Sequence, residues 1–407
     1  MLPSTFGPAR SRAPLGLAAL AVCASLLTAC DAASDALPGG GGEEPAAETT
    51  GVADTAKPAL RTSVRKGARE VPVDTVLRVA AKAAELTEVT VRHPGGALPG
   101  EISADGTRWT AGDRLEPGVR YTVEAVGKGV DGSTVRTRSA FTTQALTLDE
   151  QTYPSVAPLD GETVGVGMPV VVTFDLPVTD KAAFERNMHV TTTPAQPGSW
   201  RWVSDTEARY RPKSYWKAGT EVSVDVDING VDAGNGIYGQ EDRDIDFAVG
   251  DAHVYRVNAR THQMKVFSNG DLLRTIPITT GEQPAYTTRS GVKVIIEKFE
   301  SKTMNSETVG ITGADAYNIA GVQWAMRLTY SGEFIHAAPW SVGSQGHDNV
   351  SHGCTGMSTA DAGWLYAMTR RGDVVEYTGT DRPMEPDNGY GDWNLSWADV
   401  REGSALR

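Results

Sequence analysis

The residues of this chain best suited to chemistry lie close together towards its C-terminal end. Three of the seven His, at His336, His347 and His352, fall within seventeen residues, and Cys354 follows two positions later. A thiolate attacks carbonyl carbons, and a neighbouring imidazole removes the thiol proton and lowers the thiol pKa from its free value of about 8.5. The pattern therefore favours nucleophilic catalysis, with Cys354 as the nucleophile and His336 as the general base.

Two other interpretations of these residues stay open. In one, Cys354 is a small apolar core residue and the His side chains belong to an exposed loop, because residues 341–350 are rich in Gly, Ser, Asn and Asp. In the other, the same four side chains bind zinc, although their separations match none of the compact spacings of structural zinc sites. Catalysis is favoured because the residues cluster and because Gly353 lets a substrate carbonyl approach the backbone. The N–H groups of residues 352–354 would then stabilise an oxyanion.

The stretch around these residues resembles the signature of a known enzyme family. Fourteen residues separate His336 from the run Ser351-His352-Gly353-Cys354. This arrangement is similar to that of the L,D-transpeptidases, which carry a YkuD-type catalytic domain. The run from Tyr330 to His336 and the triplet Thr279-Thr280-Gly281 also resemble that family. The resemblance implies that Cys354 is the nucleophile, that His336 is the base and that His352 and Gly353 belong to the oxyanion site. It also places pocket residues at Tyr317, Ser331, Gly332 and Trp340, and a lid residue at Met304.

The resemblance implies a reaction on peptidoglycan. Cys354 would attack the carbonyl of the third residue of a tetrapeptide stem and release D-Ala. The thioester would then pass to a side-chain amine of a neighbouring stem, which gives a 3→3 cross-link. Carbapenems are expected as inhibitors. No metal or organic cofactor is expected, because a thiolate, an imidazole and backbone donors complete the acyl chemistry.

The chain departs from the family pattern at two positions. Gly356 stands where the family usually has Asn, which removes a side chain that can bind substrate. Ala337 stands where the family often has Ser. If the residue at 337 orients His336 through its backbone carbonyl, then Ala is sufficient.

The N-terminus predicts export. Arg10 and Arg12 precede an apolar run that is too short for a spanning helix, which is typical of a signal peptide over residues 1–30. Its end, Leu27-Thr28-Ala29-Cys30, resembles the lipobox of bacterial lipoproteins, so Cys30 is expected to carry a lipid; a plain signal peptide is the alternative. Residues 31–57 are rich in small and acidic residues and predict a flexible linker. The expected location is the outer face of the membrane, facing the wall.

An internal repeat predicts two tandem β-sandwiches. Trp109 and the stretch that ends in Tyr121-Thr122-Val123-Glu124 are matched 101 residues later by Tyr210 and a stretch that ends in Val222-Ser223-Val224-Asp225. A period near 100 residues with short alternating strands suits the immunoglobulin (Ig) type. The predicted fold is therefore mainly β, with Ig-like domains at 58–147 and 148–250.

A third domain, the predicted YkuD-type catalytic domain, is expected over residues 251–378. Asn269-Gly270 separates two apolar runs, which is a strong hairpin signal. Further strands are expected at 292–296 and 327–335. The one notable helix is expected at 358–371, where Ser358 and Asp361 form its N-terminal signal. Residues 379–407 predict a short tail that packs on the catalytic domain through its Trp residues.

Composition limits the remaining functions. The formal net charge of −13 excludes a general nucleic-acid binder, which needs clustered Lys and Arg. Cys354 is the one thiol left after the signal peptide and Cys30 are assigned, so no intramolecular disulfide is expected. Two alternatives remain for the function. One is a non-catalytic wall-binding lipoprotein. The other is a sortase, although the run from Ser351 to Cys354 does not resemble the sequence motif around the sortase Cys.

Overall fold

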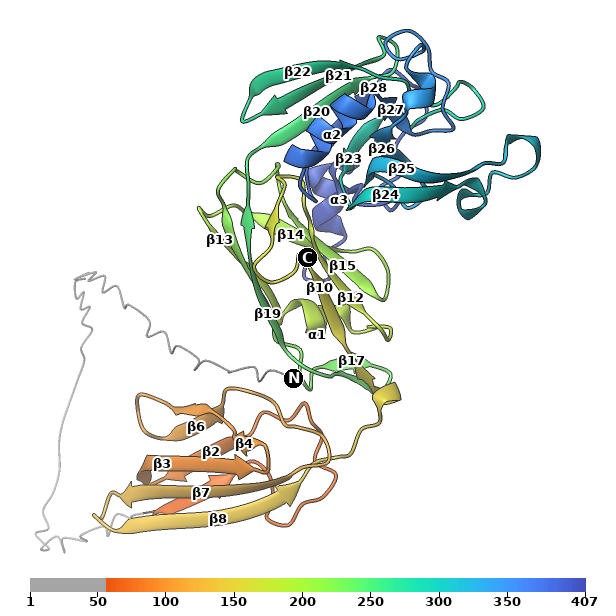
Figure 1. Ribbon diagram of the computed structural model, residues 1–407. Helices are drawn as coiled ribbons and strands as arrows, with labels where there is room; N and C mark the ends of the chain where they lie inside the picture. Colours follow the sequence, from red (N-terminus) through yellow and green to blue (C-terminus); the bar gives the residue numbers. More distant parts are fainter. Residues whose placement is uncertain (1–55) are drawn as a thin grey trace, which may run out of the picture. The chain divides into compact units, whose positions relative to one another are not determined.

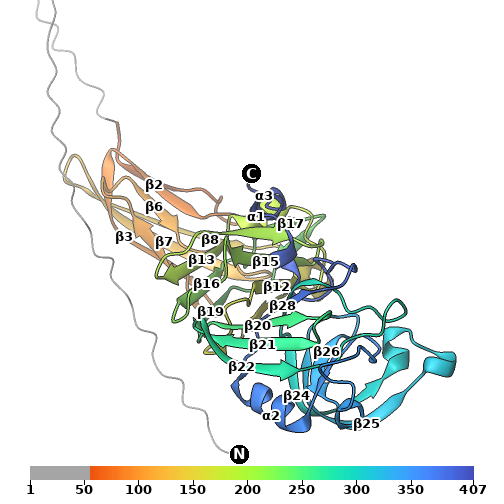
Figure 2. The same ribbon diagram turned by 90° about the horizontal axis from the view of Figure 1, so that it is seen from above.

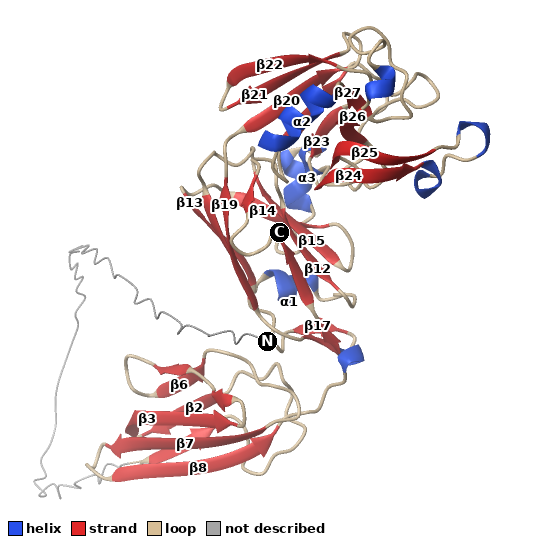
Figure 3. Cartoon of the chain, in the orientation of Figure 1, coloured by secondary structure: helices blue, strands red, loops and turns tan. Residues whose placement is uncertain are grey.

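The computed structural model of the chain describes residues 56–407. The predicted signal peptide, the lipidation site at Cys30 and most of the predicted linker 31–57 lie outside the described residues. Strands dominate the structure and its helices are short (Figure 3), so the mainly β fold expected from the sequence is confirmed. Within residues 56–407, no helix has the length and apolar character needed to cross a membrane.

Two four-stranded sheets form the first Ig-like unit. Their strand orders are β1–β2–β6–β5 and β4–β3–β7–β8. Strands β3, β7 and β8 of the second of these sheets are labelled in Figure 1. Its core includes Leu77, Tyr121 and Phe141, and the last two rings stack with centroids 5.4 Å apart. The strand bounds are β1 Ala59–Thr62, β2 Arg78–Lys82, β3 Ala84–His93, β4 Gly96–Ala97, β5 Gly100–Ile102, β6 Arg108–Ala111, β7 Arg120–Gly129 and β8 Thr134–Thr142.

The second Ig-like unit repeats this arrangement except at the edge of one sheet. Its two main sheets have the orders β10–β12–β15–β14 and β11–β19–β16–β13. A third, small sheet of the same unit has the order β17–β18–β9. Its elements are η1 Leu148–Glu150, β9 Gln151–Thr152, β10 Pro154–Ala157, β11 Thr163–Val164, β12 Val170–Phe174, α1 Lys181–Glu185, β13 Met188–Thr193, β14 Gly198–Trp202, β15 Glu207–Pro212, β16 Glu221–Val226, β17 Asp232–Gly234, β18 Ile237–Gly239 and β19 Arg243–Val249.

The repeat in the sequence corresponds to equivalent strands. Trp109 lies in β6 and Tyr210 in β15, which hold the same place in their sheets. Gly118 and Gly219 precede β7 and β16, with φ of 68° and 76°. A side chain at either position would be strained by this left-handed conformation, so the repeat keeps Gly there.

The third unit, which holds the catalytic domain predicted over residues 251–378 and is called the catalytic unit below, is built on two sheets. One has the order β22–β21–β20–β28–β23, and its first three strands lie side by side in Figure 2; the other has the order β24–β25–β26–β27. Its elements are β20 His253–Asn258, β21 Gln263–Ser268, β22 Asp271–Pro277, β23 Gly291–Val294, β24 Glu297–Asn305, η2 Ser306–Val309, η3 Gly313–Asp315, β25 Asn318–Arg327, β26 Phe334–Ala337, η4 Pro339–Ser341, β27 Thr355–Met357, α2 Thr359–Met368, β28 Val374–Thr378, η5 Asp392–Asn394 and α3 Trp397–Glu402.

The predicted hairpin at Asn269-Gly270 is confirmed, since both residues have positive φ, 50° and 93°. The prediction of a single strand over residues 327–335 is wrong. β25 ends at Arg327 and β26 begins at Phe334, and a turn with Gly332 at φ 95° separates them. That turn is what reverses the chain from β25 into the strand that carries His336.

Helix α2 begins where the sequence predicts and ends three residues earlier than expected. The Ser358 side chain accepts a hydrogen bond from Asp361 N, as in an N-cap. At the other end Thr369 is extended, and its hydroxyl donates to Leu365 O at 2.7 Å. Arg370 N donates to the buried carboxylate of Asp373 at 2.8 Å. The chain therefore leaves the helix before Arg371.

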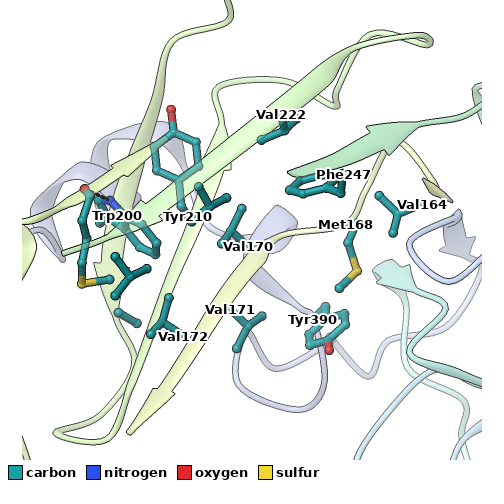
Figure 4. Close-up of a cluster of buried hydrophobic side chains, with 14 of the residues drawn as sticks. Val164, Met168, Val170, Val171, Val172, Trp200, Tyr210, Val222, Phe247 and Tyr390 are labelled. Atoms are coloured by element: carbon teal, nitrogen blue, oxygen red, sulfur yellow. Dashed lines mark hydrogen bonds between the residues drawn. The ribbon is translucent and has the colours of Figure 1, made fainter. Parts of the chain in front are cut away.

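One hydrophobic core runs from the second Ig-like unit into the catalytic unit. Val164, Met168 and Val170 pack in the same cluster as Tyr390 from the tail (Figure 4). The cluster also holds residues of the catalytic unit, namely Val294, Ile296 and Val374.

The C-terminal tail contacts both units, whereas the sequence analysis placed it on the catalytic domain. The Asn394 side chain donates to Val292 O at 2.7 Å in β23. The Trp393 indole donates to Gly167 O at 2.8 Å in the second Ig-like unit. Asp392 pairs with Arg201 at 2.6 Å and with Arg209 at 2.9 Å. The tail therefore joins the two units.

Candidate active site

Pairing between β26 and β27 brings His336 and Cys354 to one cavity. The two strands run parallel with His336 opposite Gly356, and Cys354 comes directly before β27. Both residues line a cavity of about 250 Å³. The other lining residues are Met304, Tyr317, Ile319, Val322, Trp340, Val350, Ser351 and His352. Two segments that are separate in the sequence thus supply a nucleophile and a base to the same space.

His336 is held as a neutral base. Its Nδ1 donates to the carbonyl of Ala337 at 2.8 Å, and since a carbonyl only accepts, the proton lies on Nδ1 and the lone pair on Nε2. The side chain is buried, and this burial lowers the pKa of His336 below its ordinary value. Ala337 orients the ring through its backbone alone, so a Ser at that position is not needed for this contact.

Cys354 carries a protonated thiol in this state. Its Sγ donates to Gly332 O at 3.6 Å. Burial raises the pKa of the thiol to about 11, while the Phe334 N–H opposes this rise. The charge of Glu333 raises the pKa further and that of Lys293 lowers it. A thiol of this kind needs a base such as His336 at the moment of attack.

The loop before Cys354 is fixed by its own polar groups. Ser351 Oγ donates to Cys354 O at 2.6 Å and accepts from Gly353 N at 3.1 Å. Thr288 Oγ1 donates to Gly353 O at 2.8 Å. Gly353 has φ 123°, a conformation that other residues rarely adopt. The Gly353 N–H is thus engaged with Ser351, although the sequence analysis counted it among three oxyanion donors.

His352 lies in an aromatic setting at the mouth of the cavity. Its ring lies 4.4 Å from the ring of Tyr286 and 5.0 Å from that of Tyr317, measured between centroids. Tyr286 OH in turn donates to Asp315 Oδ2 at 2.7 Å. Since Asp315 belongs to η3 at the tip of the β24–β25 hairpin, these contacts tie the hairpin to the loop that carries Cys354.

The predicted lid and pocket residues are distributed over both sides of the site. The β24–β25 hairpin projects from the rest of the catalytic unit (Figure 1), and its Met304 packs with Tyr317 and Cys354. Trp340 is exposed, and its ring lies 5.9 Å from that of His336. Gly332 lines an adjoining cavity of about 200 Å³ with Met304 and Tyr317.

Ser331 is the predicted pocket residue that lines neither of these two cavities. Its N–H donates to Asn388 Oδ1 at 2.9 Å, and its hydroxyl accepts from Asn388 Nδ2 at 2.9 Å. Ser331 therefore ties the β25–β26 turn to the C-terminal tail.

Comparison with known proteins agrees with this geometry. The profile of the L,D-transpeptidase catalytic domain (YkuD) matches residues 252–376, and that of a bacterial Ig domain matches residues 68–232. L,D-transpeptidase 2 of Mycobacterium tuberculosis is 37% identical over 360 residues, which cover 88% of this chain and 87% of the relative. The chain belongs to the L,D-transpeptidase family. The family predicted from the His336 to Cys354 stretch is thereby confirmed.

Other L,D-transpeptidases share parts of the chain. L,D-transpeptidase 5 of M. tuberculosis is 34% identical over 310 residues, which cover 74% of this chain and 67% of the relative. Among solved structures, that of the L,D-transpeptidase LdtMt1 in complex with imipenem is 37% identical. It covers 55% of this chain and 97% of its own, with a TM-score of 0.48.

The zinc interpretation finds no support in this L,D-transpeptidase. His347 is exposed on its loop. Over residues 56–407, no group of three or more His, Cys, Asp or Glu side chains has the arrangement needed to hold a metal ion.

Sequence reasoning missed the polar residues that support the site from beneath. Asn349 Oδ1 accepts from Thr280 N at 3.0 Å and from His262 Nδ1 at 3.0 Å, which anchors the loop before Ser351. Lys293 and Glu333 form a fully enclosed ion pair below Gly353. Nothing in the local pattern indicates these roles, because Lys293 lies among strand residues whose partners are 40 or more positions away.

Proposed function

We propose that this member of the L,D-transpeptidase family forms 3→3 cross-links in peptidoglycan through a thioester on Cys354. The observation that carries the proposal is the shared cavity of Cys354 and His336, in which the base has its lone pair on Nε2. The donor is a tetrapeptide stem, and the acceptor is a side-chain amine of a second stem.

In the first step the Cys354 sulfur attacks the carbonyl carbon of the third stem residue while His336 Nε2 takes the thiol proton. A C–S bond forms and the carbonyl becomes a tetrahedral oxyanion. The carbonyl then re-forms as the C–N bond to D-Ala breaks, and His336 returns the proton to the leaving amine. The raised thiol pKa suits this coupled transfer, because little free thiolate exists at neutral pH.

In the second step the acceptor amine attacks the thioester carbonyl. His336 takes a proton from that amine, the C–N bond of the cross-link forms, and the C–S bond breaks. The sulfur leaves as thiolate and takes the proton from His336, which restores the starting state. Apolar side chains line the cavity, and the buried Met304 and Val322 among them would limit the access of water that hydrolyses the thioester.

The proposal includes a location outside the cytoplasm. A lipid on Cys30 would hold the chain at the membrane, and the linker and the Ig-like units would carry the catalytic unit towards the wall. A single acyl chain binds membranes only marginally, whereas several on one residue anchor stably. A Cys30→Ser variant is expected to leave the detergent phase for the aqueous phase on detergent partition; an unchanged distribution would contradict the anchor.

The decisive experiment is acylation measured by intact mass. The full chain is incubated with a disaccharide-tetrapeptide, or with imipenem, whose strained amide presents a carbonyl to the thiol. We expect a dimer product from the first and one covalent adduct from the second. Cys354→Ala should show neither, and His336→Gln should slow both by a factor of about 10²–10⁴.

The controls keep this experiment interpretable. Ser344→Ala in the neighbouring loop should react like the parent, since Ser344 lines neither cavity. Folded parent protein that binds sacculi yet yields no dimer and no adduct would contradict the enzyme and favour a wall-binding lipoprotein. An adduct that persists in Cys354→Ala would contradict the assignment of Cys354 as the nucleophile.

A further inference from the structure

Two buried charges lie directly beneath the loop that carries Cys354. The Lys293 side chain on β23 is fully buried, and its ammonium group pairs with Glu333. The other oxygen of Glu333 accepts from Arg289 N at 3.1 Å and from Arg289 Nη1 at 3.0 Å. A Cβ placed on Gly353 would lie 3.8 Å from Glu333 Cγ. The carboxylate stem thus lies against the residue before the nucleophile.

The same pair is connected to both sides of the thiol. Glu333 lies between Gly332, whose carbonyl accepts from the thiol, and Phe334, whose N–H faces the sulfur. Lys293 Nζ lies 3.7 Å from the centroid of the Tyr377 ring. Tyr377 OH is 2.6 Å from Thr355 Oγ1, directly after Cys354. Glu333 therefore lies in the backbone segment that contacts the sulfur, and Lys293 contacts Tyr377, which in turn contacts the residue after Cys354.

Stability alone does not account for this arrangement. Replacing a buried ion pair by apolar residues of similar size is often neutral or stabilising, so such a pair is weak evidence for a structural role. Its position does suggest a role, because an uncompensated carboxylate in this place would oppose the formation of a thiolate.

We infer that Lys293 and Glu333 are positioning residues for the nucleophile: Glu333 aligns the backbone around the sulfur, and Lys293, together with Arg289 on the other carboxylate oxygen, offsets its charge there. The inference rests on the proposed role of Cys354. Charged and titratable groups face the thiol from each element packed against it. These are His336 on β26, Arg327 on β25, Tyr317 before β25, Glu333 before β26, Lys293 on β23 and Tyr377 on β28. Among them Lys293 and Glu333 are an enclosed pair of opposite charge, and the buried Arg289 is a second cation on the other oxygen of Glu333.

Opposite effects on the thiol follow from the two single substitutions. Lys293→Met leaves Glu333 with Arg289 as its remaining ion-pair partner and should raise the pKa of Cys354 by about one unit, whereas Glu333→Gln leaves both cations and should lower it by about one unit. Below the thiol pKa, one unit changes the thiolate fraction tenfold, and altered nucleophilicity offsets about half of that on a logarithmic scale. The expected change in alkylation rate is therefore about threefold in each direction. The double variant should return towards the parent rate.

The experiment follows alkylation of Cys354 by iodoacetamide in the full chain, from pH 7 to pH 9, by the mass of the peptide that contains it. Slower reaction of Lys293→Met, faster reaction of Glu333→Gln and a compensating double variant support the inference. Changes in the same direction, or none, overturn it, because a merely structural pair would not shift the pH profile in opposite directions.

Three further variants keep the test decisive if a single substitution unfolds the chain. Lys293→Arg keeps the positive charge and should keep the pH profile of alkylation seen in the parent. Lys293→Gln should react as slowly as Lys293→Met. An equal loss of alkylation rate in Lys293→Arg and Lys293→Gln overturns the inference. Asp392→Asn, in a buried ion pair of the tail, should lower the melting temperature and leave the profile unchanged. Alkylation needs no peptidoglycan, so these shifts remain measurable even if the stem peptide proves not to be the substrate.

Discussion

The two Ig-like units share most of their strand order and differ in how they connect to the catalytic unit. The first has a separate core that includes Trp109 and Phe141. The second has its core in common with the catalytic unit, so that Met168 and Val374 belong to one cluster. A repeated sandwich has thus been used in two ways, once as an independent unit and once as part of the body of the enzyme.

Buried charges reinforce the second connection. Arg209 of the second Ig-like unit is 2% exposed and pairs with Asp392 of the tail, which is also 2% exposed. Arg371, just after α2, pairs with Glu162. Burying the Arg209 guanidinium group is favourable only while its carboxylate partner is in place, whereas the Arg371 pair is partly exposed. The comparison shows that two units of similar fold can differ in whether the rest of the chain still folds when one of them is deleted.

The largest effect is expected from truncation. A chain that lacks residues 1–147 should fold and still form a covalent adduct at Cys354, because the first unit keeps its own core. A chain that lacks residues 1–250 should aggregate, because it exposes Val294, Ile296 and Tyr390. Soluble expression and intact mass check both. A soluble, reactive catalytic unit on its own would break the comparison.

The next largest effect is expected from Asp392→Ala. The change leaves Arg209 buried without one of its partners, and breaking such a pair costs about 3–5 kcal/mol. Calorimetry should show a lower melting temperature for the transition that contains the catalytic unit. The transition of the first Ig-like unit serves as the internal control and should not move. Equal shifts in both would mean that the two units are coupled after all.

A matched pair at equivalent positions sharpens the comparison. Trp109→Ala and Tyr210→Ala each remove a buried aromatic ring, at a cost of about 3 kcal/mol. The first should destabilise its own unit and leave the rate of adduct formation unchanged. The second should also lower the temperature at which that reaction is lost. Activity against temperature measures the contrast, and identical curves for the two variants would contradict it.

The smallest effect is expected at the surface of the first unit. Arg138 and Glu124 form an exposed ion pair at 3.3 Å, and exposed pairs contribute little. Arg138→Ala should change the free energy of unfolding by less than about 1 kcal/mol, measured in urea. A larger loss would show that the first unit depends on its surface charges.

Much of the site was predictable because its signal is local. The spacing of His336 and Cys354, the Gly before the thiol and the Asn269-Gly270 turn are short-range features that a chain segment carries with it. The strand prediction over 327–335 failed because alternation cannot show that Gly332 takes a positive φ and ends the run. The packing of the tail on two units was missed because Asp392 meets Arg209 across 183 positions.

The sequence by itself determined the repeated β-sandwiches, the family and the identity of the proposed nucleophile and base, because strand periodicity and motif spacing depend on neighbours along the chain. The tertiary structure alone decided three further features. It placed the His336 proton on Nδ1 through the Ala337 carbonyl. It enclosed Lys293 and Glu333 beneath the thiol, and it merged the second Ig-like core with the catalytic unit. Each of these depends on contacts made only after folding, when burial removes water from the side chains and favours one protonation state.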